Sequence, residues 1–158
     1  MVLAVSSLDH FIHVTIEEGI LEMYQGVRSS TPSFEEFHIT MSNVKYALNN
    51  PSDISWVRDQ IRKNLGYKSY QKSESIAGAL KLISSKKIWD EVEIIMGSAK
   101  AQITLELDLI IERRNKIAHE ADLDPTYPNK RWPINRSMVN DAVSHIEKIC
   151  ESIFQVVT

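Results

Sequence analysis

Apolar residues recur at helical spacing along almost the whole chain, and no stretch shows the strict alternation that is typical of a half-buried strand. The stripe near the N-terminus consists of Leu3, Leu8, Phe11, Ile12, Ile16, Ile20 and Met23. The stripe near the C-terminus consists of Val139, Val143, Ile146, Ile149, Cys150, Ile153 and Val157. Because a helix with one apolar face must bury that face against other helices, the sequence predicts an all-α bundle.

Residues that start or interrupt helices divide this pattern further. Ser33, Ser98 and either Asn135 or Ser137 are suited to cap a helix. Prolines make residues 122–133 a loop. The expected helices span residues 2–25, 34–48, 52 or 53 to 65, 73–83, 87–96, 99–120 and 135 or 137 onward. We expect the long first, penultimate and last helices to form the centre of the bundle.

The size and composition of the chain fit one globular domain that covers residues 1–158, with 43% hydrophobic residues and only five glycines and five prolines. The first helix begins abruptly without a capping residue, so we expect the domain to be truncated within a longer first helix. Cys150 is the only cysteine, which excludes an intrachain disulfide and a cysteine-based zinc site. Its place in an apolar stripe predicts a buried thiol.

Charge and hydropathy narrow the classes of partner. No signal peptide and no apolar run of about 18 residues is present, so we expect a cytoplasmic protein with no membrane partner. The net charge is −3, which argues against a general binder of polyanions. The charge is nevertheless uneven, because the stretch 113–136 holds six basic and three acidic residues. That stretch is either a surface for a phosphate backbone or an ordinary solvated helix end and loop.

The most informative residues lie near the end of the penultimate expected helix, in the run 110–120. At 100° per residue, Asn115 and His119 lie one turn apart on one side of the helix, and Arg114 lies on the flank of the same arc. The small Ala118 between them leaves room for a ligand or a second chain. Arg114 and His119 cannot aim at one atom from an ideal helix. Either the helix loosens near His119, or two copies across a dimer axis complete the site.

These three side chains suit the cleavage of a phosphodiester. Histidine takes and gives protons near neutral pH. Deprotonation of a ribose 2′-OH by His119 would let that oxygen attack its own phosphate, while Arg114 stabilises the developing negative charge. Asn115 would orient the imidazole or donate to a phosphate oxygen. This chemistry requires no metal, the sequence offers no carboxylate cluster to bind one, and we expect no cofactor.

Arg113, Lys116 and Arg131 are the candidates for binding the RNA backbone around this site. The alternatives are ordinary structural roles. For Arg113 we expect an ion pair or a solvated side chain more than a phosphate contact, and basic residues near a helix C-terminus also favour the helix dipole. We expect Trp132, in the loop after the motif, to pin that loop to the core rather than to stack on a base.

Residues 107–122 resemble the signature helix of HEPN domains (higher eukaryotes and prokaryotes nucleotide-binding domains), most closely those of the RiboL-PSP-HEPN branch. Arg114, Asn115 and His119 match the Arg-Asn-x-x-x-His motif of that family position by position. Residues 3–13 resemble the first helix of the same branch, whereas residues 27–97 offer no motif that we can match.

The resemblance implies a HEPN-like helical bundle that forms a homodimer with the motif helices at the interface. It implies an endoribonuclease that acts without a metal and leaves 2′,3′-cyclic phosphate and 5′-hydroxyl ends. It also implies a role as a toxin or defence effector, with RNA as substrate and an antitoxin or other neutralising protein as a partner. The competing hypothesis is a non-catalytic helical module for dimerisation or for binding nucleotides or RNA.

Overall fold

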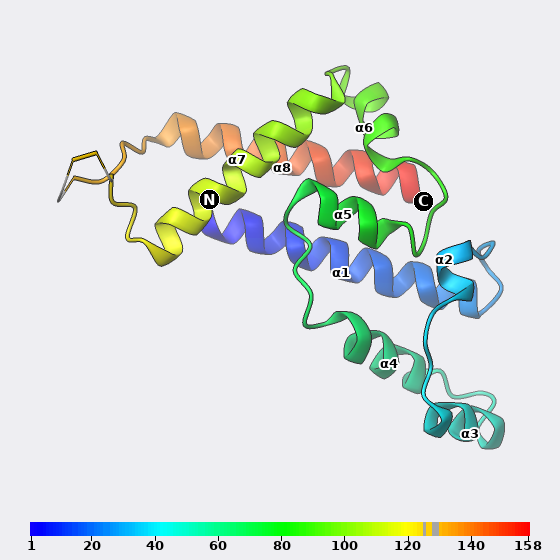
Figure 1. Cartoon of the computed structure of the whole chain (residues 1–158). Coiled ribbons are helices and arrows are strands. Elements are labelled where there is room, and N and C mark those ends of the chain that lie inside the picture. The colour runs from blue at the N-terminus through cyan, green and yellow to red at the C-terminus, as the bar shows by residue number, and fades with distance from the viewer. Residues whose placement is uncertain (125, 128–129) are drawn as a thin grey trace.

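The computed structural model describes residues 1–124, 126–127 and 130–158, and its regular structure within these ranges is helical (Figure 1). The helices of the described ranges are α1 (Val2–Tyr24), α2 (Pro32–Glu35), α3 (Met41–Asn49), α4 (Ser55–Leu65), α5 (Ser73–Leu80), α6 (Ile88–Met96), α7 (Lys100–His119) and α8 (Arg136–Val157). In the described ranges, an isolated antiparallel bridge joins Leu123 to Arg131. The all-α prediction is confirmed.

Helix α1 is the organising element of the bundle, because it packs against α4, α5, α7 and α8. Its fully buried side chains include Leu8, Ile12 and Ile16, and each contributes roughly 1.5–3 kcal/mol by leaving water. Helices α7 and α8 add Ile103, Leu107, Ile111, Ile149 and Ile153 to the same core. Figure 1 shows α3 and α4 on the opposite side of α1 from α8.

The prediction of a buried side chain is wrong for two residues of the expected apolar stripes. Leu3 is 82% exposed, because it lies five residues before Leu8 and therefore about 140° around the helix from it; Val5 occupies the core position instead. Val143 is 39% exposed, and Ala142 takes its place in the core. In both helices the rest of the stripe is buried or half-buried as predicted.

The prediction of a single helix over residues 34–48 is also wrong, since the structure has two helices there, α2 and α3. Thr31 caps α2 and Thr40 caps α3, each through a side-chain oxygen that accepts an amide N–H of the first turn. The backbone between the two helices is held from outside: the amide of Asn64 on α4 donates to the carbonyl of His38 at 2.9 Å. Tertiary contacts with α4 thus replace the hydrogen bonds that would have continued the helix.

The other helix ends lie close to their expected positions. The Asn135 side chain accepts the amide of Met138 at 2.9 Å and caps α8 as predicted. Ser98 does not cap α7, because Ala99 stands at the cap position and forms no side-chain bond. Pro133 lies in the loop before α8, whereas Pro125 and Pro128, on which the expected loop also rested, fall outside the described residues.

The expectation that the Cys150 thiol is buried is met in part. Cys150 is half-buried, and burial, assisted by Glu151 and Glu147, raises the pKa of its thiol to about 11. Within the described ranges, no helix combines the length and the hydrophobicity that spanning a bilayer requires.

Candidate functional site

The three motif residues lie in the last two turns of α7 and point in different directions. Arg114 follows Ile111 and Leu107 on the stripe of α7 that faces the core, and its side chain is half-buried. His119 is the last residue of α7 and is exposed. The two lie about 140° apart around the helix axis. One chain therefore does not aim both groups at the same atom, as the sequence predicted.

The Arg114 guanidinium is held by two neutral amides. Its Nη1 donates to Asn115 Oδ1 at 3.0 Å, and its Nη2 donates to Gln71 Oε1 at 2.6 Å. Its Nε is buried without a hydrogen-bond partner. In the described part of the chain, no carboxylate forms an ion pair with Arg114. The guanidinium is thus oriented while its charge stays uncompensated, which leaves it suited to attract an anion.

Asn115 and His119 present donors on the solvent side of α7. Because Asn115 Oδ1 accepts from Arg114, the amide NH₂ of Asn115 stays available to donate to a second group. The His119 ring makes no hydrogen bond to any other described residue, so both of its nitrogens are accessible. Helix geometry separates the two side chains by about 40°, which places them side by side.

The chain turns sharply directly after His119. Ala121 and Asp122 adopt left-handed backbone angles, with φ of 51° and 59°, at a cost of roughly 1–2 kcal/mol each. The amides of Glu120 and Asp122 both donate to the carbonyl of Lys116 at 3.0 Å, which closes the end of the helix. Helix α7 therefore stays regular through His119 and does not loosen there.

Arg113 is the residue that holds this turn. Its Nη2 donates to Asp122 Oδ2 at 2.8 Å and also to the carbonyls of Trp132 and Pro133 at 3.2 and 3.3 Å. The two side chains of the ion pair are 18% and 10% exposed. The ion pair expected as the alternative for Arg113 is present, and its contact with RNA stays a prediction.

Lys116 and Arg131 are both exposed near this end of α7. The Lys116 ammonium lies 5.8 Å from the centre of the Trp132 ring, a cation–π contact. The backbone of Arg131 pairs with Leu123, which leaves its side chain in solvent. Trp132 is half-buried and packs on the end of α7 rather than within the central core, so the loop is pinned to α7.

The sequence offered no signal for Gln71, although it is one of the two groups that orient Arg114. It lies 43 residues before Arg114, in the linker between α4 and α5. A second contact from α7 holds the first residue of α5, directly after this linker: Asp108 accepts hydrogen bonds from the amide of Ser73 at 3.0 Å and from its hydroxyl at 2.9 Å. Residues 66–72 are thereby attached to α7 next to the candidate site.

The RiboL-PSP-HEPN family model matches the chain over residues 1–158. The match includes the helix with Arg114, Asn115 and His119, and also residues 27–97, in which the sequence showed no motif. No curated protein and no solved structure matches the chain.

Proposed function

Because the chain belongs to the RiboL-PSP-HEPN family, we propose that it is a metal-independent endoribonuclease that acts as a homodimer. HEPN domains are in general ribonuclease-like. One observation carries the proposal for this chain: Arg114 is oriented by neutral amides with its charge uncompensated, while His119 is exposed one and a half turns further on. An oriented cation and an accessible imidazole, brought to one phosphate by two copies of the chain, are the minimum that this chemistry needs.

A second copy would bring the missing half of the site. Leu105 and Leu109 on α7 are 55% and 53% exposed, and His119 lies on the same face, about 40° from Leu105. Packing two such faces together would bury this apolar stripe. It would also bring two copies of His119 to one cleft.

In the proposed reaction, His119 of one copy takes the proton of a ribose 2′-OH. The 2′-oxygen bonds to the adjacent phosphorus, the bond from phosphorus to the 5′-oxygen breaks, and the histidine of the other copy protonates the leaving oxygen. Arg114 and the Asn115 amide stabilise the charge that develops on the phosphate. The products are a 2′,3′-cyclic phosphate and a 5′-hydroxyl. Lys116, Arg131 and, more weakly, Arg113 would contact the RNA backbone.

The biological role that fits such an enzyme is that of a cytoplasmic toxin or defence effector. An unrestrained ribonuclease would damage its own cell, so we expect an antitoxin or another neutralising protein as a partner. These statements rest on the family rather than on the geometry of α7.

The test is cleavage of a mixed RNA pool in the presence of EDTA, followed by mapping of the RNA ends. We expect His119→Ala to abolish cleavage and Arg114→Ala to lower it about 10²–10³-fold. We expect His10→Ala, which removes an exposed histidine of α1, to leave cleavage unchanged. If His119→Ala and Arg114→Ala cleave RNA as the unaltered protein does, the enzyme proposal is wrong.

One observation favours the competing function of a non-catalytic module. The Arg114 guanidinium already joins α7 to the α4–α5 linker through Gln71, which is a structural task. In that case Arg114→Ala would lower the stability of the fold or of the dimer, and the unaltered protein would bind RNA without cutting it.

A further inference from the structure

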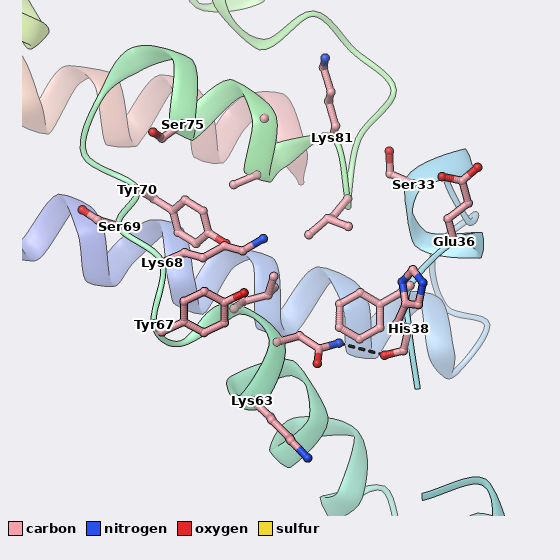
Figure 2. Close-up of a pocket in the computed structure, with 16 residues that line it drawn as sticks. Ser33, Glu36, His38, Lys63, Tyr67, Lys68, Ser69, Tyr70, Ser75 and Lys81 are labelled. Carbon is pink, nitrogen blue, oxygen red and sulfur yellow. Dashed lines mark hydrogen bonds between the residues drawn. The ribbon is translucent and has the colours of Figure 1, made fainter. Parts of the chain in front are cut away.

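A large hollow of about 1020 Å³ lies away from the motif, bordered by α2, α4, α5 and the linker 66–72 (Figure 2). Arg114, Asn115 and His119 do not line it. Its volume lies at the upper end of the range for small-molecule sites, and it is open to solvent. Such a hollow has room for more than one nucleotide unit.

The charge of the hollow is positive and uncompensated. Lys63, Lys68 and Lys81 line it, against Glu36 as the acidic group. In Figure 2 the Lys68 side chain runs between the two labelled tyrosines, and Lys63 and Lys81 stand at opposite ends of the view. None of the three lysines forms an ion pair with a described residue. On a chain whose net charge is −3, such a cluster is a local site for an anion.

A second hollow, of about 610 Å³ between α1 and α4, shows the opposite arrangement. There Arg58 lies 2.6 Å from Glu17, and Arg62 lies 3.3 Å from the same carboxylate. Burial raises the pKa of Glu17, but the hydrogen bonds from Arg58 and Arg62 outweigh this effect and hold the pKa below its ordinary value. The two arginines of that hollow are already neutralised, whereas the three lysines of the larger hollow form no ion pair with a described residue.

Two aromatic rings accompany the free lysines. Tyr70 is buried, and its ring centre lies 4.7 Å from that of His13. Its backbone amide donates to Asp9 Oδ1 at 2.5 Å, so Tyr70 forms a fixed wall of the hollow. Tyr67 is 79% exposed and offers an open ring face. Aromatic rings interleaved with free lysines are typical of sites that stack bases and hold the phosphates of a single strand.

The hollow is connected to the candidate site by adjacent residues. Tyr67, Lys68 and Tyr70 form its wall, and Gln71, the next residue along the linker, accepts a hydrogen bond from Arg114 through its side-chain amide oxygen. A strand lying in the hollow would therefore have a short path over the linker to α7.

We propose that this hollow binds single-stranded RNA through Lys63, Lys68, Lys81 and Tyr67, and so holds a segment adjacent to the bond that is cut. The last clause rests on the proposed ribonuclease function, whereas the binding itself does not. The lysines neutralise phosphates, and the Tyr67 ring stacks on one base.

The test is fluorescence anisotropy of a labelled, mixed-sequence 2′-O-methyl RNA, which has no free 2′-OH and cannot be cut by the proposed reaction. We expect the triple variant Lys63→Gln, Lys68→Gln, Lys81→Gln to bind at least roughly tenfold more weakly. The slope of log affinity against log salt should fall by about 2, since three phosphate contacts on a single strand are lost. Tyr67→Ala should weaken binding by roughly tenfold, and Tyr67→Phe should not.

The matched control is Lys45→Gln, Lys87→Gln, Lys148→Gln, which removes the same charge from exposed lysines elsewhere. Equal losses in the two triple variants, or no loss in the first, would overturn the proposal. The proposal would also be overturned if an acidic peptide bound in the hollow and RNA binding stayed unchanged. If RNA binding depends on the hollow but no RNA is ever cut, the ribonuclease proposal fails and this one stands.

Discussion

Arg113 and Arg114 are neighbours in the sequence and differ in nearly every physical respect. Arg113 is paired with the buried carboxylate of Asp122, and two backbone carbonyls accept from the same nitrogen. Among the described residues, the hydrogen-bond partners of the Arg114 guanidinium are the neutral amides of Gln71 and Asn115. The first guanidinium is neutralised and holds the chain together, whereas the second has no ion-pair partner among the described residues. Compensation of charge, rather than residue type or position, separates the structural arginine from the candidate catalytic one.

The largest effect should come from Arg114→Ala. Removal of a group that stabilises transition-state charge typically lowers the rate about 10²–10³-fold. We expect a loss of this size in kcat for RNA cleavage, with a change of about 1 kcal/mol or less in the free energy of unfolding. Initial rates and urea denaturation on the same preparation would measure both. A stability loss that accounts for the whole decline in activity would contradict the comparison.

Arg113→Ala should behave in the opposite way. It leaves Asp122 buried without its partner, so we expect the free energy of unfolding to fall by about 3 kcal/mol. Urea denaturation measures this loss. Arg113→Ala combined with Asp122→Asn should recover part of it, because the unpaired charge is then removed. Cleavage by the folded fraction of Arg113→Ala should stay within a few-fold of the unaltered protein, and a loss equal to that of Arg114→Ala would refute the distinction.

Leu105→Glu would test whether Arg114, unlike Arg113, depends on a second copy. A charge in the exposed apolar stripe of α7 should weaken the dimer roughly 100-fold, which sedimentation velocity would detect. Cleavage should fall with the dimer fraction, while the folded monomer keeps its stability. Leu48→Glu, at a site on α3 that is 78% exposed, is the matched control. An active monomer would rule out the two-copy site.

The smallest and sharpest change is Gln71→Glu, which would give Arg114 the kind of partner that Arg113 has. A carboxylate in place of the Gln71 amide should add up to about 1 kcal/mol to the free energy of unfolding. It should lower kcat roughly tenfold, since a compensated guanidinium stabilises less charge on the phosphate. Thermal melts and initial rates against Gln71→Asn would measure the two effects. Unchanged activity would show that cleavage does not depend on an uncompensated charge on Arg114.

The local features of this protein were predictable from its sequence. Helical periodicity located the core face of α1 and α8 apart from Leu3 and Val143, and Asn135 caps α8 as its residue type predicts. The spacing of Arg114 and His119 was enough to show that one regular helix cannot aim both side chains at the same atom. These features depend on bonds and angles within a few residues, which one segment of sequence contains in full.

The tertiary structure alone decided what each polar group meets. The interruption between α2 and α3 depends on Asn64, the orientation of Arg114 depends on Gln71, and the basic hollow draws its walls from several helices and a linker. Each of these contacts joins residues that are distant in the chain. No short-range pattern carries the information, because packing of the apolar faces sets which polar groups become neighbours. The sequence by itself determined most of the helices and the motif on α7; the packing determined which arginine forms an ion pair and which does not.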